Sequence, residues 1–88
     1  MKLEGYAVFD AAVGAYNRPM FFRSRAEAVR SFQDAVRDPQ SSLGSHARDY
    51  SWCYVGDFDD SSGVFEPVGT PVRVCGALDF VVGDDPTA

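Results

Sequence analysis

Residues 49–65 constrain the fold of this chain more than any other segment, because two strand-like runs flank a turn signal there. The first run is rich in aromatic and β-branched residues, which fit a pleated, half-buried surface. The sequence DDSSG at residues 59–63 then supplies side chains that bond their own backbone and a glycine that can adopt a positive φ. We therefore expect a β-hairpin here, and with it an antiparallel sheet.

The best-marked element is a helix predicted from about residue 25 to residue 37. Ser24 and Glu27 have the S-x-x-E spacing of a capping box, which satisfies N–H groups at a helix start. Apolar residues recur at three- and four-residue spacing on one face: Ala28, Val29, Phe32, Ala35 and Val36. The opposite face carries Glu27, Arg30, Asp34 and Arg37. Asp38-Pro39 should end the helix, since the residue before a proline avoids the α region.

Three other runs predict strands, at residues 6–9, 16–22 and 70–75. Pro19 lacks a backbone N–H, so the second of these runs either lies at a sheet edge or begins after the proline, and we expect an edge. Residues 40–48 read as a polar loop, and the apolar run at 78–82 has no assigned role. The predicted fold is α+β, a small antiparallel sheet of four or five strands with one helix packed across one face.

The length of 88 residues suits one domain, expected over residues 1–82, followed by a mobile acidic C-terminal tail at 83–88. No apolar run approaches the roughly 18 residues of a membrane span, and the N-terminus lacks the apolar stretch of a signal peptide. We expect an intracellular protein without membrane contact. Cys53 and Cys75 match no redox or zinc spacing, and buried free thiols are favoured over a disulfide.

Residues suited to catalysis or metal binding are few. His46 lies in a Ser/Gly-rich loop and reads as a surface histidine. The acidic group at 57–60 fails the calcium-loop pattern, because Ser62 and Val68 occupy the positions that need glycine and an acid. No glycine-rich phosphate loop is present in the sequence. We therefore expect a protein that is not an enzyme and that holds no cofactor or metal.

Binding of nucleic acid is the remaining chemistry, although the formal net charge is -5. Residues 1–48 carry seven basic side chains against five acids, whereas residues 49–88 carry one against eight. Arginines can track phosphates while bases stack on aromatic rings. The candidate nucleic-acid-binding residues are Arg18, Arg23, Arg25, Arg30, Arg37, Trp52 and Tyr54. The same residues are also explained by an ordinary salt-bridged surface and by a core of aromatic side chains. We expect Trp52 to be partly buried and the arginines to supply most of the affinity for DNA.

An ordered set of motifs goes beyond propensity. It begins with YAVFD at residues 6–10, continues with PMFFRS at 19–24 and with EAVRSFQDAVRDP at 27–39, and ends with DYS at 49–51 and GDFDDSSGVF at 56–65. This set resembles the small nonstructural protein of gokushovirus-type microviruses, the bacteriophages of the Microviridae with circular single-stranded DNA. The resemblance covers residues 6 to about 68 and leaves the acidic C-terminal third unmatched.

The resemblance implies an accessory protein of the host cytoplasm that is absent from the finished capsid, binds single-stranded DNA and assists the switch from genome replication to genome packaging. It supplies no binding-site motif, so the contact residues above rest on charge and stacking alone. We expect a homodimer. The rival hypothesis is a protein-interaction module that binds a viral or host replication or assembly factor without nucleic acid, through a sheet edge or the acidic tail.

Overall fold

The computed structural model describes residues 1–81, and the end of the expected domain at residue 82 and the expected tail at 83–88 lie outside the described part. The strands are β1 (Lys2–Asp10), β2 (Ala15–Tyr16), β3 (Met20–Phe22), β4 (Tyr50–Asp59) and β5 (Val64–Gly76). The helices are α1 (Arg25–Arg37), α2 (Ser42–Ser45) and two short 3-10 helices, η1 (Ala47–Asp49) and η2 (Ala77–Phe80). No helix within residues 1–81 is long and apolar enough to cross a membrane.

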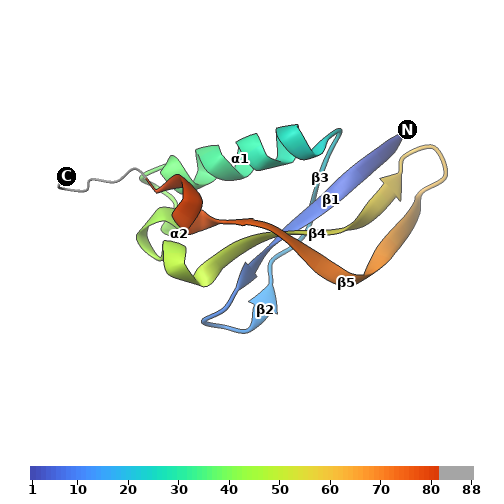
Figure 1. Ribbon diagram of the computed structural model, residues 1–88. Coiled ribbons are helices and arrows are strands. Elements are labelled where there is room, and N and C mark those ends of the chain that lie inside the picture. The colour runs from blue at the N-terminus through green and yellow to red at the C-terminus, as the bar shows by residue number, and fades with distance from the viewer. Residues whose placement is uncertain (82–88) are drawn as a thin grey trace.

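The strands form one antiparallel sheet in which β1 and β4 are central. The strands β2 and β3 both pair with the free side of β1, and β5 pairs with β4 at the opposite edge. Figure 1 shows α1 lying across one face of the sheet, so the predicted α+β architecture is confirmed. The edge position expected for residues 16–22 is also confirmed, but residues 17–19 around Pro19 interrupt the strand and divide it into β2 and β3.

The helix α1 has the predicted bounds and the predicted N-cap. The Ser24 side chain accepts a hydrogen bond from the backbone N–H of Glu27 at 3.2 Å. The Glu27 carboxylate accepts from the backbone N–H of Arg23 at 2.9 Å, one residue before the position that a capping box uses. The apolar face buries Ala28, Phe32 and Val36 against the sheet, so the predicted stripe is confirmed.

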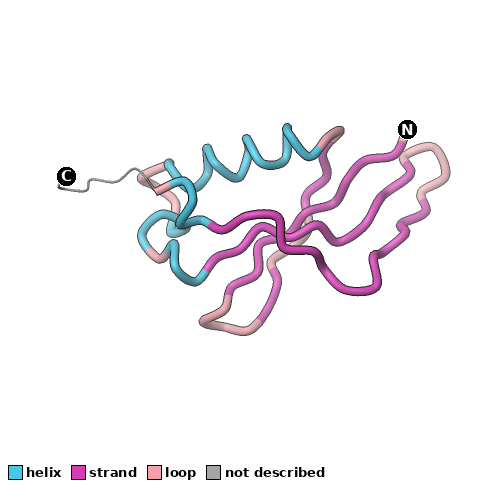
Figure 2. The backbone as a smooth tube through the Cα atoms, in the orientation of Figure 1, coloured by secondary structure: helices cyan, strands magenta, loops and turns pink. Residues whose placement is uncertain are grey.

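The predicted hairpin is confirmed, but its second strand is longer than expected. The strand β5 includes the segment at 70–75 that the sequence indicated as a separate strand, because an edge strand tolerates prolines. Tyr54 pairs with Val72 and Gly56 pairs with Pro67, so residues 68–71 lie opposite the single residue Val55. This bulge bends β5, as Figure 2 shows, and lets the turn between β4 and β5 project beyond the start of α1.

Two segments differ from the sequence prediction. The expected loop at 40–48 contains α2 and the start of η1, because the Ser41 side chain accepts from the backbone N–H of Leu43 and caps α2. The apolar run that begins at Leu78 lies mostly in η2, and its Phe80 ring packs edge-on against Phe32. Both segments close one end of the core between α1 and the sheet.

Candidate nucleic-acid interface

The core beneath α1 is built around Trp52, which is only 1% exposed. Its ring stacks on Phe32 at a centroid distance of 5.0 Å and on Tyr6 at 5.6 Å. The expectation of partial burial is therefore wrong, because the indole is almost completely enclosed by the core. Strand alternation places Tyr54 on the same face of the sheet as Trp52, and α1 covers that face. A base cannot stack on this ring in the manner that the sequence suggested.

The indole N–H of Trp52 is the one buried side-chain N or O atom within residues 1–81 that has no hydrogen-bond partner. An unpaired buried donor costs about 1–3 kcal/mol, because it loses its bond to water and gains nothing in return. Such a group calls for a structural or functional explanation.

Arg25 and Tyr54 belong to a polar network at the start of α1. The Arg25 Nε donates to the Tyr6 hydroxyl at 3.2 Å, and its guanidinium lies 5.8 Å from the centre of the Tyr54 ring. The Tyr54 hydroxyl donates to Asp57 at 2.6 Å, and this bond, with the burial of the phenol, raises the pKa of Tyr54 to about 12. Both predicted contact residues thus already have partners within the protein.

The arginines of the outer helix face follow a seven-residue spacing. Arg23, Arg30 and Arg37 are exposed. Arg30 and Arg37 lie roughly 10 Å apart along α1, at about 1.5 Å per residue, whereas Arg23 precedes the N-cap Ser24. Arg23 forms an ion pair with Glu27 at 3.5 Å, and the Arg37 Nε donates to the backbone carbonyl of Phe80 at 3.1 Å. Arg30 makes no ion pair or side-chain hydrogen bond within residues 1–81. Glu27 and Asp34 share this face, so its charge is mixed.

Arg18 occupies a different surface. It lies at a groove of about 580 Å³ between the β2–β3 connection, β1 and the start of α2. The lining residues are Val8, Asn17, Arg18, Met20, Ser42, Leu43 and Trp52. We call this the Trp52 groove. The structure therefore brings together two of the predicted contact residues, Arg18 and Trp52, which are distant in sequence.

The electrostatics of the Trp52 groove differ from those of the whole chain. Arg18 is its only charged lining residue, and no carboxylate lines it, although the formal net charge of the chain is -5. Arg18 is exposed and makes no ion pair with any residue that the structure describes. Sequence reasoning missed Asn17, Ser42 and Leu43. The Ser41 cap, which predicts a short helix, was an available signal for Ser42 and Leu43, whereas no local pattern indicated Asn17.

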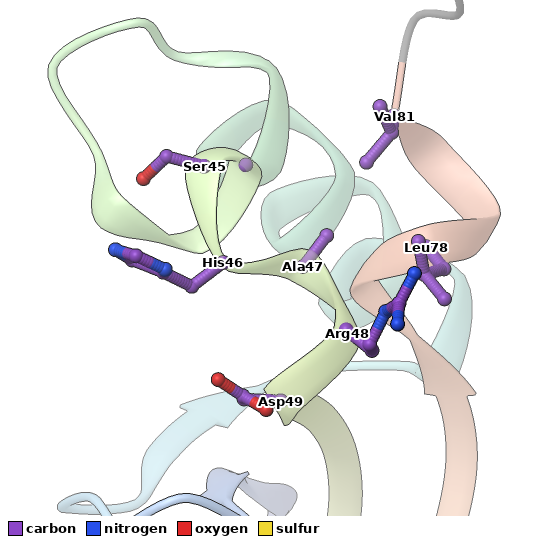
Figure 3. A pocket seen from close by; sticks show the side chains of 8 residues that line it. Ser45, His46, Ala47, Arg48, Asp49, Leu78 and Val81 are labelled. Carbon is purple, nitrogen blue, oxygen red and sulfur yellow. The ribbon is translucent and has the colours of Figure 1, made fainter.

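A second pocket of about 370 Å³ lies between the α2–η1 segment and η2 (Figure 3). Figure 3 shows the His46 ring turned away from Arg48 and Leu78. His46 is exposed, as predicted, and its ring makes no hydrogen bond within residues 1–81, while the Ser45 hydroxyl donates to the Ser42 backbone carbonyl. Thus Ser45 and His46 do not form a nucleophile–base pair in this arrangement.

The projecting end of the hairpin is acidic. Asp57, Asp59, Asp60 and Glu66 gather there, partly neutralised by the N-terminal amine and by Lys2. The N-terminal amine lies 2.9 Å from the Asp60 carboxylate, and the Lys2 ammonium lies 3.0 Å from the Glu66 carboxylate. No group of three potential metal ligands is present among the described residues. None of these four acids lines the Trp52 groove, where Arg18 is the only charged lining residue.

The face of the sheet opposite α1 carries an aromatic cluster of Phe21, Phe58 and Phe65, which we call the Phe21 cluster. The ring of Phe21 lies 5.6 Å from that of Phe58 and 6.1 Å from that of Phe65. Phe21 and Phe65 remain 41% and 39% exposed. Gly5 permits this packing, because a Cβ atom there would lie 2.9 Å from the Phe21 ring.

The remaining predicted features agree with the structure in part. Cys53 and Cys75 are both free, as favoured, but only Cys53 is fully buried, and burial raises the pKa of its thiol. The helix face opposite the apolar stripe is exposed at Glu27, Arg30, Asp34 and Arg37, as expected.

Comparison with known proteins identifies relatives of this chain. The family model described as Phage ORF5 protein matches residues 3–80. The chain is 34% identical over 72 residues to Protein ORF5 of Chlamydia phage 1, and this match covers 77% of the chain and 75% of the relative. No solved structure matches significantly. The predicted resemblance to a small protein of microvirus-type phages is thereby confirmed.

Proposed function

The chain belongs to the Phage ORF5 family, and we propose that it is a non-enzymatic accessory protein that binds single-stranded DNA in the host cytoplasm. In this proposal it assists the switch from genome replication to the packaging of single strands. The observation that carries the proposal is the Trp52 groove, where an unpaired arginine lies beside apolar walls without any carboxylate. Phosphate attraction together with apolar contact to bases is the chemistry by which proteins hold single strands.

Binding uses the arginines unequally. Arg18 and Arg30 have no partner among residues 1–81 and are available to phosphates, whereas Arg25 is engaged with two tyrosines. Arg23 and Arg37 contribute to the positive potential of the helix but already bond Glu27 and the Phe80 carbonyl. We therefore assign the main phosphate contact to Arg18.

The test is binding of a fluorescently labelled single-stranded oligonucleotide by anisotropy over a series of salt concentrations. Affinity should fall with salt at a log-log slope of about -0.7 for each phosphate neutralised. Arg18→Gln should weaken binding and reduce the slope by about that amount. Arg73→Gln removes the same charge from β5, at the opposite edge of the sheet, and should leave the slope unchanged. Equal slopes for the wild type and Arg18→Gln would contradict the assignment.

A second candidate is a protein-interaction module, and the exposed Phe21 cluster favours it. Partly exposed aromatic rings gathered on one sheet face are typical of protein contact surfaces. Under this second proposal, the Phe21 cluster either joins two copies into a homodimer or binds a viral or host replication or assembly factor. The acidic end of the hairpin would attract a partner rich in Lys and Arg.

Sedimentation equilibrium tests the homodimer, with a mass of about twice 9.6 kDa expected for the wild type. Phe65→Ser should shift the chain toward the monomer. Val13→Ser replaces another exposed apolar residue, 73% exposed and outside the Phe21 cluster, and should not shift it. A monomeric wild type would refute the homodimer, and absence of DNA binding at low salt would favour the protein-partner function.

A further inference from the structure

The Trp52 groove is large enough for a small ligand. Its volume of about 580 Å³ lies within the roughly 300–1,000 Å³ range of small-molecule sites. Four of its lining residues are apolar or aromatic, namely Val8, Met20, Leu43 and Trp52. We propose that the Trp52 groove holds one unpaired base of a bound single strand, with the adjoining phosphate at Arg18. This inference rests on the proposed function and specifies that the groove accepts a base of the strand.

Asn17 gives the groove groups that can form hydrogen bonds with the edge of a base. Bases present carbonyl and ring-nitrogen acceptors beside amino donors. The Asn17 carboxamide offers both kinds of group, and its side chain has no hydrogen-bond partner within residues 1–81. The Asn17 backbone N–H donates to the Val8 carbonyl at 2.8 Å, so this residue is held in place beside β1.

The unpaired indole N–H of Trp52 favours a ligand that carries a hydrogen-bond acceptor. Trp52 lines the groove, and its Nε1 has no acceptor among the described residues. A base carbonyl entering the groove would provide one. The nitrogen is shielded from solvent, so the wall must adjust when the base enters. Met20 suits that adjustment, because it is 50% exposed and unbranched.

The charge of the groove favours a base that belongs to a nucleic acid strand. Arg18 is unpaired among residues 1–81, and the other pocket, by contrast, contains Asp49 beside Arg48. A phosphate next to the base would therefore meet one guanidinium and no carboxylate. The outer face of α1 mixes arginines with acids, and none of its residues lines either of the two pockets described above.

The test compares a labelled thymidine oligonucleotide with an abasic oligonucleotide of the same length, which carries the same phosphates without bases. The wild type should bind the thymidine strand roughly tenfold more tightly, because a base in the groove gains a hydrogen bond and apolar contacts that the abasic strand lacks. The fluorescence of Trp52, the only tryptophan, should change with the thymidine strand and not with the abasic strand.

Ser42→Phe fills the groove and should abolish the preference while leaving the affinity for the abasic strand and its salt slope unchanged. Ser45→Phe is the matched control, because Ser45 is exposed on α2 but does not line the groove, and it should retain the preference. Asn17→Ala should also reduce the preference for the thymidine strand. Because Asn17 lies in an exposed connection between strands, this variant keeps the test valid even if Ser42→Phe fails to fold.

Equal binding of both oligonucleotides by the wild type would overturn the base pocket and leave the proposed DNA-binding function standing on phosphate contacts. Retention of the preference in Ser42→Phe would likewise overturn it. No binding of either strand at low salt would overturn both the inference and the proposed function.

Discussion

Replacement of Trp52 tests the packing that the structure gives to this residue. A buried tryptophan removes roughly 150–250 Å² from water, which at about 25 cal/mol/Å² contributes up to about 4–6 kcal/mol. Trp52→Ala should therefore reduce the free energy of unfolding by about 3–5 kcal/mol. Such a loss is a large part of the roughly 5–15 kcal/mol that stabilises a typical domain.

Trp52→Phe should behave differently. The smaller ring loses part of the contact with Phe32 and Tyr6, at a cost of about 1–3 kcal/mol. It also removes the unpaired indole N–H, which costs about 1–3 kcal/mol in the wild type. The two effects oppose each other, so the change should stay within about 2 kcal/mol of zero, below the cost of Trp52→Ala.

Urea denaturation followed by far-ultraviolet circular dichroism provides the measurement, since both variants lose the only tryptophan. Phe21→Ala is the control, because this ring is 41% exposed and its loss should cost much less than that of Trp52. Equal destabilisation by Trp52→Phe and Trp52→Ala would refute the reasoning about the orphaned donor. A Trp52→Ala variant as stable as the wild type would refute the core assignment itself.

Two further substitutions test local features. Ser24→Ala removes the N-cap of α1 and should cost about 1 kcal/mol in the same urea experiment, while a change below about 0.3 kcal/mol would contradict the role of the cap. Asp57→Asn should lower the pKa of Tyr54 from about 12 toward the usual value of about 10, as followed by ultraviolet absorbance, because the carboxylate favours the neutral phenol. The raised pKa stabilises the wild-type fold below about pH 10, and this stabilisation is lost as the pH rises through about 12. An unchanged Tyr54 titration in the variant would contradict this interaction.

Local patterns determined the parts of the fold that could be predicted from the sequence. The helix start followed from Ser24 and Glu27, whose side chains both bond backbone N–H groups at that end. The hairpin followed from a turn sequence in which Gly63 adopts a φ of +77°. In both cases the deciding contacts join residues only a few positions apart, so the sequence alone contained the information.

The rest depended on contacts between distant residues. The sequence predicted a separate strand at residues 70–75, but β5 runs continuously through Pro67 and Pro71, because its outer edge has no partner strand within the described chain. The period of two placed Trp52 and Tyr54 on one face without indicating which face α1 would cover. The Trp52 groove combines Arg18 with Ser42 and Trp52, and no local pattern links these positions.

We propose that single-stranded DNA binds at the Trp52 groove, and amide and indole NMR shifts measured during titration with an oligonucleotide test this binding residue by residue. The single indole N–H resonance of Trp52 and the amides of Arg18, Met20 and Leu43 should shift together and saturate with the bound fraction. The amides of Asp59 and Asp60, at the acidic end of the hairpin, should not shift. Shifts confined to the hairpin or to the Phe21 cluster, or no shifts at low salt, would contradict the claim.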